Sequence, residues 1–143
     1  MSNALESRES ISLFVLGERL GQAEFSRYLA ELDRCIERGT PFAMIVDGSS
    51  PKLEIVELPP RSWQRSRATA IAKLHRGVAF VAGGMTHDRV RALYALQPPG
   101  VLYGFFASVD EAREWARGAL EGTSVSVMSQ RKTQPLMSVV RGS

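Results

Sequence analysis

Short apolar runs alternate along this chain with segments whose apolar residues recur every three or four positions. Four runs are rich in β-branched and aromatic residues and stop at turn-forming residues, as strands usually do. We predict strands at Ile11–Leu16, Phe42–Val46, Val78–Ala82 and Val101–Ala107. The run Phe42–Val46 is apolar throughout, which indicates a central strand of a parallel sheet that is buried on both faces.

Four further segments have the period of an amphipathic helix. We predict helices at Gln22–Arg38, at Arg61–His75, from Thr86 to about Leu96, and from Ser108 to about Leu120. Thr86 can cap the third helix, and Ser108 with Glu111 forms a capping box at the start of the fourth. Cys35 lies in register with the apolar residues of the first helix, so we expect a buried, structural thiol.

The resulting order β-α-β-α-β-α-β-α predicts an α/β fold, with a four-stranded, mostly parallel sheet flanked by helices. A length of 143 residues and a hydrophobic fraction of 44% suit a single globular domain. We place this domain at residues 11–121, after a flexible N-terminus at residues 1–10. The C-terminal tail at residues 122–143 is rich in Ser, Thr and Gln, and we expect it to be loosely ordered, with one short strand at Ser124–Met128.

Composition narrows the classes of protein to which the chain can belong. A single cysteine excludes an intrachain disulfide and a cysteine-rich zinc site. No apolar run approaches the roughly 20 residues of a transmembrane helix, and Glu6, Arg8 and Glu9 stand where a signal peptide would be apolar. We therefore expect a cytoplasmic protein without a transmembrane segment. A net charge of +3 is below that of dedicated nucleic-acid binders, so we expect no dedicated nucleic-acid binding.

Three fragments in the second half of the chain carry a family resemblance: GVAFV at 77–81, RALYALQPP at 91–99 and FASVDEAREWA at 106–116. Together they resemble the last third of the SpoIIAA-like family, which is related to STAS domains and to CRAL-TRIO lipid-transfer domains. Phe25–Ser49 also looks like the first helix and second strand of that family. The resemblance implies a STAS-like fold and a bacterial, non-catalytic module that binds a partner.

Some STAS-related domains are switched by phosphorylation of a serine that follows a central strand. The resemblance places Ser49 and Ser50 at this position. Pro51 and an irregular segment follow where that family would start a helix directly. A capped turn is therefore the alternative interpretation of Ser49 and Ser50.

Loops at the carboxyl ends of the predicted strands are candidates for binding a small ligand, since open α/β sheets bind ligands where the strand order reverses. The candidate ligand-binding residues are Asp47, Ser49, Ser50, Gly83, Gly84, Thr86 and His87. Gly83 and Gly84 would leave amides accessible before a helix N-terminus, which favours a small anion. The resemblance to a family related to lipid-transfer domains implies a lipid as another ligand. A turn that requires positive φ explains the same two glycines.

Basic residues are concentrated between Pro60 and Arg91, where seven of them accompany only one acidic residue, Asp88. The candidate partner-binding residues on the second predicted helix are Arg61, Arg65, Arg67 and Lys73. Such a face can recognise an acidic protein or an anionic lipid surface. No series of aromatic residues is interleaved among these cations to stack on bases, and a solvated helix face is the alternative interpretation.

Catalytic chemistry is the least supported class, since the chain has no Gly-x-Ser-x-Gly, P-loop or dinucleotide motif. His75, expected to be exposed or to cap the second helix, and His87 do not have metal-ligand spacing. We therefore assign no catalytic residue, no metal and no cofactor, and enzyme activity stays an open third hypothesis. The first hypothesis is a non-catalytic STAS-like adaptor or regulatory protein that binds another protein and can form a homo-oligomer. The alternative is a small-ligand or lipid-binding protein.

Overall fold

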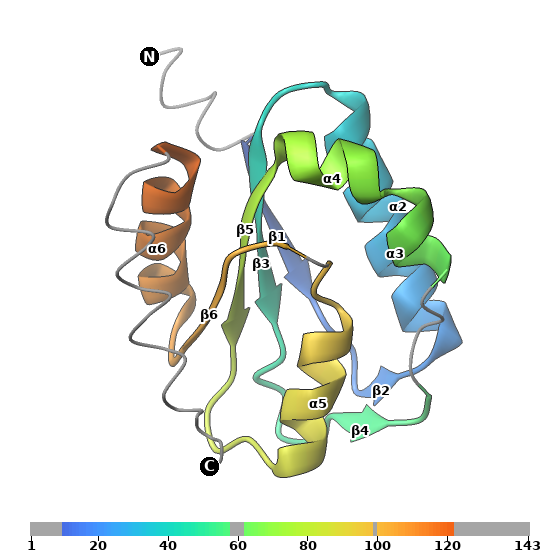
Figure 1. Ribbon diagram of the computed structural model, residues 1–143. Coiled ribbons are helices and arrows are strands. Elements are labelled where there is room, and N and C mark those ends of the chain that lie inside the picture. The colour runs from blue at the N-terminus through green and yellow to red at the C-terminus, as the bar shows by residue number, and fades with distance from the viewer. Residues whose placement is uncertain (1–9, 58–61, 99, 122–143) are drawn as a thin grey trace.

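Four parallel strands form the main sheet of the computed structural model, which describes residues 10–57, 62–98 and 100–121 (Figure 1). The strands are β1 (Ile11–Val15), β3 (Phe42–Asp47), β5 (His75–Val81) and β6 (Tyr103–Phe106). They lie side by side in the order β1-β3-β5-β6, and all three pairings are parallel. The expectation of an α/β fold with a four-stranded parallel sheet is confirmed at this level.

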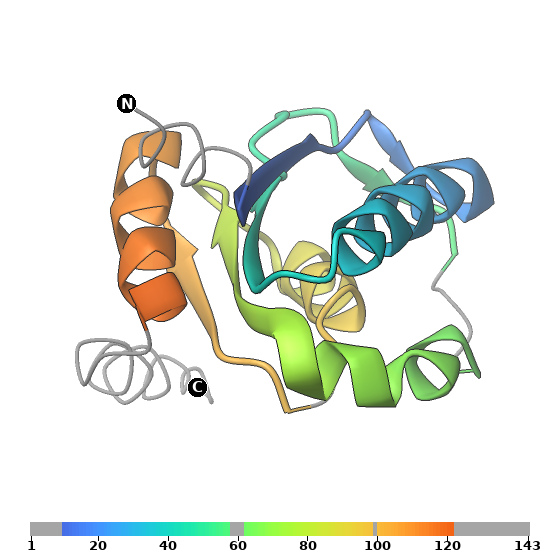
Figure 2. The ribbon, with the colours of Figure 1, turned by 90° about the horizontal axis from the view of Figure 1, so that it is seen from above.

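Helices cover both faces of the sheet, as Figures 1 and 2 show. The helices are α2 (Gln22–Glu37), α3 (Ser62–Ser66), α4 (Ala68–Leu74), α5 (His87–Ala95) and α6 (Val109–Glu121). Of the described helices, α2, α4 and α5 lie on one face of the sheet and α6 lies on the other. The sheet is therefore the middle of three layers.

Two apolar cores result, because successive side chains of a strand point to opposite faces. On β3, Met44 and Val46 pack in the core beneath α2, α4 and α5, and Ala43 and Ile45 pack in the core beneath α6. All four side chains are fully buried, so the predicted two-sided burial of this strand is confirmed.

Glycine allows α6 to approach the sheet closely at Gly77 of β5. A Cβ atom at this position would lie 2.9 Å from Cη2 of Trp115 and 3.3 Å from Cβ of Ala119. Gly77 is paired with Ala43, which in turn is paired with Ile11. The last turns of α6 therefore lie over the beginning of the strands.

The local signals for helix ends were accurate. Thr86 accepts a hydrogen bond from the Arg89 amide and caps α5. The Glu111 amide donates to Ser108 Oγ, while the Glu111 carboxylate accepts from the Ala107 amide, so the predicted capping box is present. Cys35 is 1% exposed, which confirms its expected place in the core.

The segment predicted as one helix at Arg61–His75 differs from the prediction. It contains two short helices, α3 and α4, with Arg67 between them at φ −110° and ψ 5°, and Arg61 lies outside the described residues. His75 is 6% exposed and begins β5, so the expectation that it could be a solvent-exposed residue was wrong. Its ring packs on Phe42, with centroids 4.6 Å apart, and its backbone amide still closes the last turn of α4 on Ile71.

A second, two-stranded parallel sheet joins β2 (Arg19–Leu20) to β4 (Glu54–Ile55). The irregular segment after Pro51 did not predict a strand, because strands of two residues carry too few side chains to show a period. The predicted strand at Ser124–Met128 and the assigned flexible ends lie largely or wholly outside the described residues, which exclude 1–9 and 122–143.

Candidate functional site

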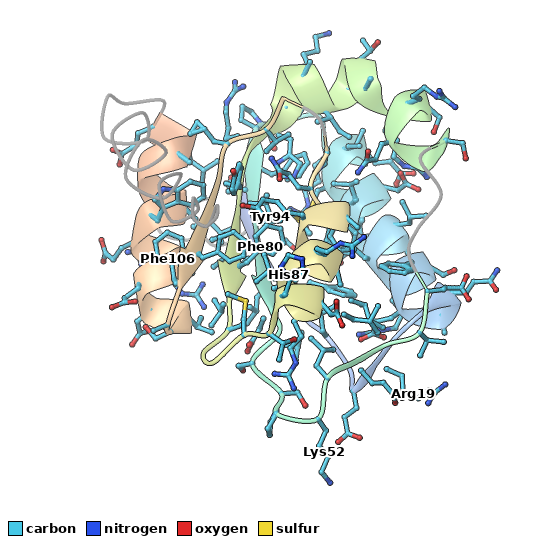
Figure 3. All side chains as sticks on the ribbon, turned by 60° about the horizontal axis from the view of Figure 1, so that its bottom comes forward. Arg19, Lys52, Phe80, His87, Tyr94 and Phe106 are labelled. Atoms are coloured by element: carbon cyan, nitrogen blue, oxygen red, sulfur yellow. The ribbon has the colours of Figure 1, made fainter. Side chains whose placement is uncertain are left out.

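The loops after β3 and β5 meet at the carboxyl edge of the sheet. The Gly48 amide donates to the Val81 carbonyl at 2.8 Å, and the Arg89 guanidinium donates to the Pro51 carbonyl at 2.8 Å. Two candidate ligand-binding segments, 47–50 and 83–87, are therefore held at one end of the molecule. Figure 3 shows this end, with His87 on α5 and with Lys52 extending outward.

Asp47 and Ser49 form a tight turn that uses most of their own hydrogen-bonding groups. The Asp47 carboxylate accepts from the Ser49 amide at 3.1 Å and from the Ser49 hydroxyl at 2.6 Å. Ser50 Oγ accepts from the Lys52 amide at 3.3 Å. This hydrogen bonding is that of a capped turn, and it keeps a carboxylate at the place where an anion would have to bind.

Gly83 and Gly84 lie in an exposed turn between β5 and α5. Gly84 has φ +59°, a conformation that side chains rarely adopt, so the turn itself requires glycine at this position. A Cβ atom at either residue would meet no atom within 4 Å. His87 is exposed in the first turn of α5 and makes no hydrogen bond or ion pair with the described part of the chain.

The strand order bears on whether this edge holds a ligand. Along the four described strands the order follows the chain from β1 to β6, with no reversal. A crevice forms at a reversal because the helices on its two sides leave on opposite faces of the sheet. Here α2, α4 and α5, which connect the strands, share one face, so the physical basis for expecting a crevice is absent from the described strands.

Basic side chains line the exposed side of α3 and α4. Arg65 and Lys73 are exposed, and neither forms an ion pair with the residues that the structure describes. Arg76, just after α4, donates to the Lys73 carbonyl at 3.2 Å. We call Arg65, Lys73 and Arg76 the basic helix face. Arg76 is one of the seven basic residues between Pro60 and Arg91, and its place three residues after Lys73 is the signal that could have added it to the candidate residues.

Arg67 has a different role from the one expected of it. Its Nε and one Nη donate to the two Asp33 carboxylate oxygens at 2.7 and 2.9 Å, so the guanidinium joins α4 to α2. The carboxylate of Asp33 raises the pKa of Arg67. Because the side chain is only 23% exposed, Arg67 contributes mainly to packing between helices.

A second group of charges lies along α2 where this helix faces β1. Glu24 accepts from Arg27 and from the Gly17 amide, and Arg27 also donates to the Val15 carbonyl at 2.9 Å. Burial alone would raise the pKa of Glu24, but the hydrogen bonds from Arg27 and Gly17 outweigh burial and lower it. Glu and Arg residues at helical spacing also occur on ordinary solvated faces, so the sequence pattern does not distinguish these residues as a site.

The two histidines cannot act together, since His75 begins β5 and His87 follows its carboxyl end. In the described ranges, no group of three or more His, Cys, Asp and Glu residues is arranged to hold a metal ion. None of the helices in these ranges is long and apolar enough to cross a membrane. Comparison with models of protein families, with curated proteins and with solved structures found no match.

Proposed function

We propose that this chain is a non-catalytic adaptor or regulatory protein that binds an acidic protein partner through the basic helix face. One observation carries the proposal. The segment 62–76 contains four basic residues and no acidic residue, and only Arg67 has a carboxylate partner among the described residues. Arg65, Lys73 and Arg76 therefore remain without a carboxylate partner among the described residues, on α3, on α4 and just after α4.

The shape of this surface also suits a protein partner. Thr69 and Ala72 are exposed between Arg65 and Lys73, and these small side chains let another backbone or helix approach closely. Cations that face water without a carboxylate partner accelerate encounter with an acidic surface and help to select it. The partner is thus a protein with an exposed cluster of Asp and Glu side chains.

We further propose that the chain is a STAS-like module of the bacterial SpoIIAA-like type. The fragments from Arg76 to Arg117 that resemble this family support the proposal, as does a sheet of four parallel strands joined by helices. We also propose a cytoplasmic location, which is supported by a single buried cysteine, because secreted domains of this size often carry disulfides.

The experiment that tests the adaptor function is a pull-down from a lysate of the source cells with the double variant Arg65→Glu and Lys73→Glu. We expect this variant to lose a partner that the unmodified chain retains. The matched control is Lys52→Glu with Arg91→Glu, which makes the same charge change at two exposed residues away from the basic helix face. Arg67 is left intact, because its reversal would break the ion pair with Asp33.

Loss of the partner only in the Arg65 and Lys73 variant supports the adaptor function. An equal loss in both variants would attribute the binding to overall charge, and full retention in both would rule out this face. Circular dichroism of each variant verifies that the fold is intact.

The alternative function is binding of a small anionic ligand or a lipid at the carboxyl edge. One observation favours this function. Hydrogen bonds from Gly48 and Arg89 hold the loop after β3 against the end of β5 and the N-terminus of α5. Such a protein should retain its ligand through gentle purification. Native mass spectrometry of the intact chain distinguishes the two functions, since an adaptor gives the mass of the protein alone.

A further inference from the structure

Among the described strands, β1 forms one margin of the main sheet (Figure 2), and one of its edges pairs with β3. The Leu16 amide donates to the Asp47 carbonyl of β3 at 2.9 Å. Because backbone groups of successive residues point to opposite edges of a strand, those of Ile11, Leu13 and Val15 point away from the sheet. No strand in the described part of the chain pairs with this outer edge.

This outer edge lacks most of the features that normally protect edge strands. Proteins protect such edges with charged side chains, proline or bulges. The segment Ile11–Val15 contains no charged residue and no proline, and its register with β3 is continuous. Within the described ranges, Arg27 of α2 donates a hydrogen bond to this edge, at the Val15 carbonyl.

Two large apolar side chains lie uncovered on the same strand. Leu13 is 43% exposed and Val15 is 54% exposed, and the only other large hydrophobic side chain this exposed in the described residues is Val56. Both point to the side of the sheet where α6 lies. Helix α6 packs on Ile11 at the start of the strand and leaves Leu13 and Val15 in contact with water.

Charged residues of α2 border this edge in an alternating order. The Ser12 hydroxyl donates to Glu31, and Arg27 donates to the Val15 carbonyl, so one flank of α2 runs along β1. From one end to the other, this flank carries Glu24, Arg27, Glu31 and Arg34. In a dimer with a twofold axis, the second copy presents this flank in the opposite direction. Each Glu of one copy then lies opposite an Arg of the other. A parallel arrangement would instead bring like charges together.

We propose that two copies of this chain associate through antiparallel pairing of their β1 strands. When the two β1 strands pair along their full length, the twofold axis passes through Leu13, and Ile11 of one copy lies opposite Val15 of the other. The two four-stranded sheets then become one continuous sheet, and the exposed Leu13 and Val15 side chains pack against their counterparts. The Val15 carbonyl has two lone pairs, so it can bind both Arg27 and the second strand.

The first test measures the molar mass of the full chain by size-exclusion chromatography with light scattering. We expect twice the 15.7 kDa of one chain. The variant Val15→Lys should lose the dimer, because two lysines would enter the shared edge. The matched control is Val56→Lys, which charges a valine of similar exposure, 47%, outside the main sheet and should stay dimeric. Thermal melts of the variants verify that both remain folded.

The second test fixes the register with the variant Leu13→Cys under mild oxidation. Opposed residues of a hydrogen-bonded antiparallel pair have Cα atoms about 5.5 Å apart, which a disulfide can span. We expect a cross-linked dimer for Leu13→Cys and none for Val56→Cys, and the buried Cys35 does not compete. A monomeric unmodified chain, a dimer that survives Val15→Lys, or equal cross-linking of both cysteine variants would overturn the proposal.

Discussion

His75 is buried without a hydrogen-bond partner for either ring nitrogen in the described structure. Its ring packs on Phe42, and the residue is 6% exposed. Burial disfavours the charged imidazolium and lowers the pKa of His75 to about 3 from an ordinary value of 6.5. The residue is therefore a neutral, ring-shaped part of the core.

This burial predicts a loss of stability in acid. Between the folded pKa and 6.5 the unfolded chain binds a proton at His75 that the folded chain does not, so the free energy of unfolding falls as the pH is lowered through this range. In this range His75 alone changes the free energy of unfolding by about 1.4 kcal/mol per pH unit. We expect His75→Phe to remove this part of the slope, and urea unfolding at several pH values measures it.

The control for this prediction is His87→Phe, which changes an exposed histidine and should keep the pH dependence of the unmodified chain. An unchanged slope in His75→Phe would show that carboxylates alone produce the acid sensitivity. Sequence reasoning assigned His75 to a helix end because it follows a helical period. The bulge that pairs Phe42 with His75 and Ala43 with Gly77 is a tertiary feature that the period does not show.

Helix α4 depends on its neighbour α2 more than on its own length. Seven residues are too few for an independently stable helix, so packing of Ile71 and the ion pair between Arg67 and Asp33 must hold it in place. The pair is bidentate, which fixes the orientation of the guanidinium as well as its distance. Arg65 and Lys73, on either side of Arg67 in the sequence, are exposed.

Removing the ion pair should therefore destabilise the chain more than removing a neighbouring cation. We expect Arg67→Ala to lower the free energy of unfolding by about 1 kcal/mol, and Arg65→Ala to change it by less than about 0.5 kcal/mol. Urea unfolding of both variants measures the difference. A double-mutant cycle with Asp33→Ala isolates the coupling between the two side chains, and a coupling near zero would contradict the proposed role of Arg67.

Elements with a strong internal period could be predicted from the sequence. Helix α2 begins and ends within a residue of its predicted bounds, and the apolar run Phe42–Val46 lies within β3. The break at Arg67 and the short strands β2 and β4 were not predicted, because tertiary contacts produce them rather than local periodicity. The candidate site was affected in the same way: Arg65 and Lys73 are exposed as expected, whereas a carboxylate distant in sequence binds Arg67.

At the scale of the whole molecule, the basic helix face and the β1 edge belong to different elements. Substitutions on α3 and α4 change no residue of β1, and substitutions on β1 change no residue of the basic helix face. We expect Arg65→Glu with Lys73→Glu to lose the protein partner and stay dimeric, and Val15→Lys to become monomeric and keep the partner. Light scattering and pull-down of the same preparations measure both properties. Simultaneous loss of both properties in either variant would mean that the two surfaces act as one.

The order of the strands has a consequence for synthesis on the ribosome. Each strand of the main sheet pairs with the strand that precedes it in that sheet, so a nascent chain can add one strand and one covering helix at a time without waiting for distant partners. Helix α6 alone returns across the opposite face, over side chains from β1, β3 and β5. Until these last described residues emerge, no described helix covers that apolar face of the growing sheet, and chaperones that bind exposed apolar surface would act at this stage.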